Sequence, residues 1–132
     1  MSLKGLVSLA RDKSAAASVE FALVSGMYIS FLFGVIYIAI MMFTDLSLHF
    51  AVQRSARMAA VGTTATESDV RTALNGYLAA LGIPAATVSY TIGGGAFPVA
   101  HISATLTQSY TLPLISTFDV TYAAETYVPQ GS

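Results

Sequence analysis

The chain has 132 residues, of which 55% are hydrophobic and 10% are charged, and its formal net charge is -1. This length allows one small domain, and a mean hydropathy of +0.67 is too apolar for an ordinary soluble fold. The near-neutral charge argues against nucleic acid as a partner, and the absence of cysteine excludes a disulfide framework and a thiolate metal site.

Residues 1–15 form a short basic leader, which carries Lys4, Arg11 and Lys13 against a single Asp12. Basic residues before a membrane span favour the cytoplasmic side, so the leader predicts a cytoplasmic N-terminus and an extracytoplasmic C-terminal part. A cleaved secretory signal has its small residues after the apolar core. Here the small residues at 14–18 come before it.

An apolar stretch follows and predicts a membrane span over about residues 21–43. Between Ala16 and Phe43 the only charged side chain is that of Glu20. A helix over 21–43 would rise about 35 Å, enough to cross the roughly 30 Å hydrocarbon layer of a bilayer. A chain of this size has no soluble core large enough to bury such a helix, so we expect a single-pass membrane protein.

The passage RDKSAAASVEFALV resembles the N-terminal processing region of TadE-like pseudopilins, accessory subunits of the tight-adherence (Flp-type) branch of type IV pili. In that family the mature chain opens with four small or apolar residues, a glutamate and an aromatic residue. Glu20 and Phe21 match the last two positions. The resemblance therefore implies cleavage between Ala15 and Ala16 by a prepilin peptidase, with Ala15 where the family often has glycine.

The resemblance also implies a function: a minor pilin or pseudopilin that helps to initiate, stabilise or cap an adhesive pilus. The implied partners are the inner membrane, the major pilin, other minor pilins or pseudopilins, the prepilin peptidase and the pilus assembly platform. The implied location is the inner (cytoplasmic) membrane and, after assembly, the fibre. Two alternatives stay open: an unprocessed bitopic assembly factor, and an unrelated single-span protein whose extracytoplasmic domain binds a ligand.

Glu20 has a physical interpretation beside the family one. A carboxylate at the start of a membrane helix is costly unless it is paired or stays at the interface. After cleavage it would lie one helical turn from a new amine at Ala16, and an amine on a neighbouring subunit could neutralise it, as in pilin filaments by analogy. The alternative is an interfacial glutamate that faces headgroups or Lys13.

Small residues recur at every fourth position of the span and predict a ridge on which another helix could approach closely. They are Ser18, Ala22, Gly26, Ser30 and Gly34. The alternative is that glycine and serine are simply common in membrane helices.

Helical spacing continues past Phe43, so we expect one helix from residue 16 to about 61, ended by Gly62. Its outer half is amphipathic, with Leu46, Phe50 and Met58 as the predicted apolar face and Asp45, Gln53, Arg54 and Arg57 as polar residues. Together with Gly62 this helix forms a predicted segment 16–62.

Residues 63–132 predict a small extracytoplasmic α+β domain. Thr66 and Asp69 give a partial capping box for a helix over about 67–81, which Gly82 and Pro84 would end. Period-two alternation then predicts an antiparallel sheet of about three strands, near 88–92, 100–106 and 118–122. A loop of glycines at 93–95 would join the first two, Pro98 and Pro113 would mark strand limits, and the tail ETYVPQGS would be loose.

No combination of residues in the chain predicts catalysis. Asp45 and His49 share a helix face, but these two ligands are too few for a metal site. Asp119, Glu125 and His101 are too scattered to act as acid and base. We therefore expect a protein that is not an enzyme, with no catalytic residues, cofactor, metal or small-molecule substrate.

Overall fold

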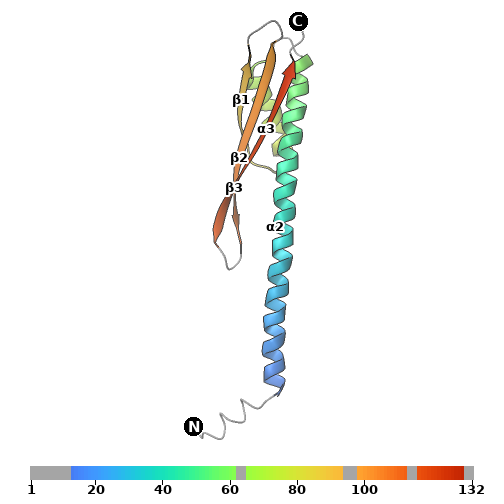
Figure 1. The fold of residues 1–132 in the computed structure, drawn as a ribbon, viewed down its shortest axis with the longest axis vertical. Coiled ribbons are helices and arrows are strands. Elements are labelled where there is room, and N and C mark those ends of the chain that lie inside the picture. The colour runs from blue at the N-terminus through green and yellow to red at the C-terminus, as the bar shows by residue number, and fades with distance from the viewer. Residues whose placement is uncertain (1–12, 62–64, 94–97, 113–115, 130–132) are drawn as a thin grey trace. The chain divides into compact units, whose positions relative to one another are not determined.

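The computed structural model describes residues 13–61, 65–93, 98–112 and 116–129. The elements in chain order are helix α2 (Lys13–Val61), helix α3 (Glu67–Ala80) and strands β1 (Thr87–Ile92), β2 (Val99–Thr111) and β3 (Thr117–Pro129) (Figure 1). The three strands form one antiparallel sheet in the order β1-β2-β3. The predicted α+β class, with a long N-terminal apolar helix, one further helix and a three-stranded sheet, is confirmed.

The chain divides into two compact units, Met1–Ala39 and Ile40–Ser132, and the boundary falls inside α2. The second unit holds the core, which is built from the outer half of α2, α3 and the inner face of the sheet. Its largest fully buried side chains are Leu48, Val52, Leu74, Leu78 and Ile102, together with the hydroxyl-bearing Ser55. The outer half of α2 is therefore part of this core, and the other elements pack against it.

The prediction of the apolar face of the outer half of α2 is wrong, because a different face of the helix packs into the core. Leu46, Phe50 and Met58 are 65%, 53% and 56% exposed. The buried face instead follows helical spacing through mostly small residues: Thr44, Ser47, Leu48, Ala51, Val52, Ser55, Ala56 and Ala59. Small side chains let a helix approach its neighbours closely. On this face the hydroxyls of Thr44 and Ser55 donate to backbone carbonyls of the same helix, at 3.0 and 2.9 Å.

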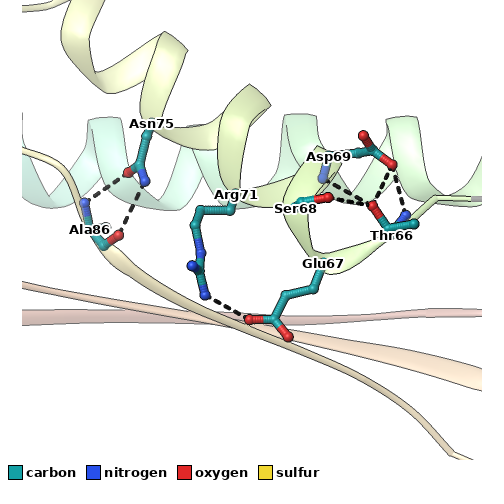
Figure 2. A network of polar contacts seen from close by, with 7 residues as sticks. All are labelled: Thr66, Glu67, Ser68, Asp69, Arg71, Asn75 and Ala86. Carbon is teal, nitrogen blue, oxygen red and sulfur yellow. Dashed lines mark hydrogen bonds and ion pairs between the residues drawn. The ribbon is translucent and has the colours of Figure 1, made fainter.

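Helix α3 has the predicted signals at both ends. The Asp69 backbone N–H and carboxylate contact Thr66 reciprocally, which completes the capping box (Figure 2). At the other end Gly82 has a φ of 72°, and the backbone N–H groups of Gly82 and Ile83 donate to the carbonyls of Ala79 and Leu78 at 3.0 Å. This pair of bonds is the Schellman arrangement, which favours glycine at the position with positive φ.

Asn75 connects α3 to the chain that enters the sheet. Its side-chain oxygen accepts from the Ala86 backbone N–H at 2.8 Å, and its amide nitrogen donates to the Ala86 carbonyl at 3.3 Å (Figure 2). Val70, Leu74 and Leu78 bury one stripe of the helix. The stripe and this side-chain contact hold α3 against the segment that leads into β1.

The tail that we expected to be loose is a strand as far as Pro129. Residues 125–129 extend β3 and pair with the beginning of β2, from Ser103↔Glu125 to Val99↔Pro129. On the outer face of the sheet Tyr127 stacks on His101, with ring centroids 4.5 Å apart. The period-two pattern of β3 in fact continues through Ala124, Thr126 and Val128, and β2 provides a full-length partner for it.

Several sequence predictions fall on residues outside the described ranges. These are the leader up to residue 12, the stop at Gly62, two of the three loop glycines, the strand limit at Pro113 and the tail after Pro129. Pro98 directly precedes β2, as expected of a strand limit.

Candidate functional site

The candidate site is the apolar segment of α2 from residue 16 to residue 43. None of its side chains is buried, and Phe21, Met27 and Phe31 are 75%, 75% and 68% exposed. A core helix of a soluble domain would bury one face. The segment therefore exposes apolar surface all round, as a helix does when its surroundings are lipid or other apolar helices.

Among the described residues, α2 is the one helix that is long and apolar enough to cross a membrane. Its most apolar 18-residue window has a mean hydropathy of 2.1 and no buried residue. The helix is thus a candidate membrane span near the N-terminus of the chain.

The predicted cleavage junction lies inside α2, because the helix begins at Lys13 and continues through Ala15 and Ala16. Glu20 and Phe21 follow with both side chains exposed. Residues four positions apart are neighbours on a helix surface, so the backbone nitrogen of Ala16 and the Glu20 carboxylate belong to the same face. Glu20 thus lies one turn from the amine that cleavage would create, and its neutralisation by an amine of a neighbouring subunit stays a prediction.

The five ridge residues lie on one continuous helix, and four of them are exposed while Gly34 is half-buried. The Ser30 hydroxyl donates to the Gly26 carbonyl at 2.8 Å, which satisfies a polar group that lipid could not. A β-carbon at Gly26 or at Gly34 would meet no atom within 4 Å. Packing within the described chain therefore does not require glycine at either position, and the ridge is open to another helix.

Both described histidines lie beside a carboxylate in an isolated pair outside this segment. His49 lies 3.9 Å from Asp45 and His101 lies 3.2 Å from Glu125. In the described part of the chain no group of three metal-binding side chains gathers at one place. The His101–Glu125–Tyr127 contacts were not predicted, because they depend on pairing residues 24 and 26 positions apart across β2 and β3.

Comparison with known proteins matches residues 15–57 to the TadE family, described as TadE-like protein. No curated protein and no solved structure shows significant similarity to the chain. The matched stretch begins at the predicted cleavage junction, contains the whole apolar segment and ends in the outer half of α2. It confirms the resemblance found in the sequence: residues 15–57, which hold most of the long N-terminal helix, are similar to TadE-like proteins.

Proposed function

We propose that this chain is a minor pilin or pseudopilin that takes part in assembly of a Tad/Flp-type adhesive pilus through its N-terminal helix. The observation that supports this most directly is the apolar segment 16–43, which has no buried side chain and lies within the TadE-like stretch. Such a surface is stable only in lipid or against other apolar helices. One helix can therefore anchor the precursor in the inner membrane and later pack among pilin helices in a fibre.

The remaining partners follow from this assignment. The prepilin peptidase would cut between Ala15 and Ala16, and the assembly platform would transfer the product to a fibre of major and minor pilins. Glu20 would set the register by pairing with an amine of a neighbouring subunit, because an unpaired carboxylate among apolar helices is costly. The ridge around Gly26 would be the place where helix backbones approach each other.

The ridge gives the sharpest test of this function. Replacing Gly26 with leucine places a bulky side chain where a neighbouring helix would lie, and we expect it to lower the amount of the chain in sheared pili severalfold. Ala39→Leu is the matched control, because position 39 lies on the opposite face of the helix and its side chain is also exposed. Both variants should remain in the membrane fraction. Equal recovery of Gly26→Leu and Ala39→Leu in pili would refute packing through this ridge.

An unprocessed bitopic assembly factor is the second candidate. The observation that favours it is the position of the predicted scissile bond within α2, whose first turn would have to open before a peptidase could bind it. The first turn of a helix is the easiest part to open, so this does not prevent cleavage. Intact mass of the membrane-extracted protein separates the two: a chain that starts at Ala16 supports the pilin, and an uncut chain supports the assembly factor.

A further inference from the structure

The outer half of α2 carries an exposed stripe that the core of this chain does not use. The stripe combines apolar and cationic side chains at helical spacing, and we name it the outer stripe: Leu46, Phe50, Arg54, Arg57, Met58 and Val61. Met58 is 56% and Val61 87% exposed. A shallow hollow with a largely apolar lining lies over Arg54, Arg57, Met58 and Val61. Exposed apolar surface with charges at its edge is typical of a protein-binding surface.

The two arginines of the outer stripe are not neutralised within the described residues. Neither forms an ion pair there, and Arg54 instead lies over the Tyr77 ring of α3, 5.6 Å from the centroid. Phe50 packs against the same ring, with centroids 5.5 Å apart. The contact with this ring is a cation–π contact and involves no carboxylate, so the charge of Arg54 is left for a partner to neutralise.

The described aspartates and glutamates of the second unit, in contrast, each have a polar partner within it. Glu67 pairs with Arg71 at 2.7 Å, and Asp69 accepts from Thr66. The other three contact a histidine or a serine: Asp45 with His49, Glu125 with His101 and Asp119 with Ser109. The described carboxylates of a second copy of this unit thus already have polar contacts of their own, and two outer stripes face to face would bring like charges together.

Lipid does not account for the outer stripe either. The uncharged apolar run ends at Phe43, and Val61 lies about 27 Å further along the helix. The headgroup layer on each side of a bilayer is only about 5–8 Å thick. Leu46 could reach that layer, but Met58 and Val61 lie beyond it.

We propose that the outer stripe docks an acidic amphipathic helix of a different protein, and this rests on the proposed role in pilus assembly. The carboxylates of that helix would pair with Arg54 and Arg57, and its apolar side chains would cover Met58 and Val61. The stripe follows the α2 axis for about 23 Å, a length that suits a helix of some four turns packed along it. Charge pairing at the edge selects the partner, and the apolar contacts exclude water.

The test places a photo-crosslinking residue at position 58 of the full chain, in cells that assemble the pilus. We expect an adduct with a different protein, and Arg54→Glu with Arg57→Glu should lower its yield about tenfold. The milder pair Arg54→Gln and Arg57→Gln should give an intermediate yield that falls with added salt. Arg71→Glu is the matched control, since it reverses an exposed arginine outside the stripe. Changing acidic residues of the crosslinked partner segment to arginine should restore the adduct with the double glutamate variant.

Three results would overturn the proposal: an adduct between two copies of this chain, a yield unaffected by the arginine changes, or no adduct at all. The lipid alternative has its own readout. The protein is reconstituted alone in phosphatidylglycerol vesicles with an environment-sensitive dye attached to Met58→Cys. The emission maximum of the dye would shift to the blue if lipid covered the outer stripe.

Recovery of the protein in sheared pili, measured in the same cells, keeps the two proposals separate. If the chain enters pili but no arginine-dependent adduct forms, the docking proposal fails and the pilin assignment remains. If the adduct forms and the chain never enters pili, the pilin assignment fails instead.

Discussion

At the scale of single residues, two tyrosines on the inner face of the sheet form a buried hydroxyl pair. The hydroxyl oxygens of Tyr110 and Tyr122 are 2.8 Å apart, and the Tyr110 hydroxyl donates to the Gln108 side chain at 3.2 Å. Burial, and then the hydrogen bond with Tyr110, raise the pKa of the Tyr122 phenol well above its usual value. The fold therefore requires the neutral form of this side chain.

Because its pKa is higher in the folded protein than in the unfolded chain, Tyr122 contributes stability that is complete below about pH 10. That contribution declines as the pH rises from the ordinary tyrosine value of 10.0 toward the raised one. We expect Tyr122→Phe to lower the free energy of unfolding by about 1 kcal/mol at pH 7 and to reduce its fall above pH 10. Denaturant titrations at pH 7 and pH 11 measure both. Tyr127→Phe, on the solvent face, is the matched control, and an equal alkaline loss in wild type and Tyr122→Phe would contradict the account.

At the scale of elements, α3 is the clearest case of a helix whose ends are determined locally. The capping box at Thr66 and the Schellman arrangement at Gly82 both satisfy backbone groups that a helix end would otherwise leave unpaired. The ion pair between Glu67 and Arg71 adds an i,i+4 contact on the exposed face. These contacts depend on neighbouring residues and not on the sheet.

The capping box predicts a response to acid. Hydrogen bonds from the Thr66 side chain, and then from its backbone N–H, lower the pKa of the Asp69 carboxyl below its usual 3.8. Its contribution to stability is therefore present above about pH 4 and is lost as the pH falls through the lowered pKa. Asp69→Asn should remove this acid-dependent contribution to stability. Thr66→Ala should lower the free energy of unfolding by about 1 kcal/mol at pH 7. Thermal unfolding between pH 2.5 and 7 measures both effects, and an unchanged acid profile in Asp69→Asn would exclude this role.

At the scale of the whole molecule, the chain combines a core in Ile40–Ser132 with an apolar helical segment that has no buried side chain between residues 16 and 39. The two parts follow different rules. The core unit hides its apolar side chains from water, while the segment requires an apolar environment outside the described chain.

Membrane extraction tests this division. Leu32→Arg combined with Ile36→Arg puts two charges near the centre of the segment, at a cost of about 5–7 kcal/mol for insertion. We expect the wild-type protein to stay in the pellet after an alkaline carbonate wash and the double variant to be released or degraded. Leu46→Arg, whose exposed position lies past the apolar run, should behave as wild type. Release of the wild-type protein itself would argue against a membrane span.

Local and periodic signals were sufficient for part of this protein. The apolar run from Phe21 to Phe43, the caps at Thr66 and Gly82 and the alternation of the strands predicted α2, α3 and the sheet, because each depends on residues close together in the sequence. The TadE-like resemblance likewise came from a short contiguous passage and was confirmed by the family match. The candidate site residues could be located in the same way, because they lie in one contiguous stretch of the sequence.

Contacts between distant parts of the chain determine which surfaces of these elements meet. Hydrophobicity predicted Leu46, Phe50 and Met58 as the apolar face of the outer half of α2, whereas the face that α2 buries holds Leu48 and Val52 among smaller alanine, serine and threonine residues. Close approach of a helix to its neighbours is limited by side-chain size as well as by polarity, so most of the residues that face inward are small. The tail became a strand for a related reason: β2 offers residues 99–103 as partners for 125–129, and such pairing depends on contacts between residues far apart in the chain.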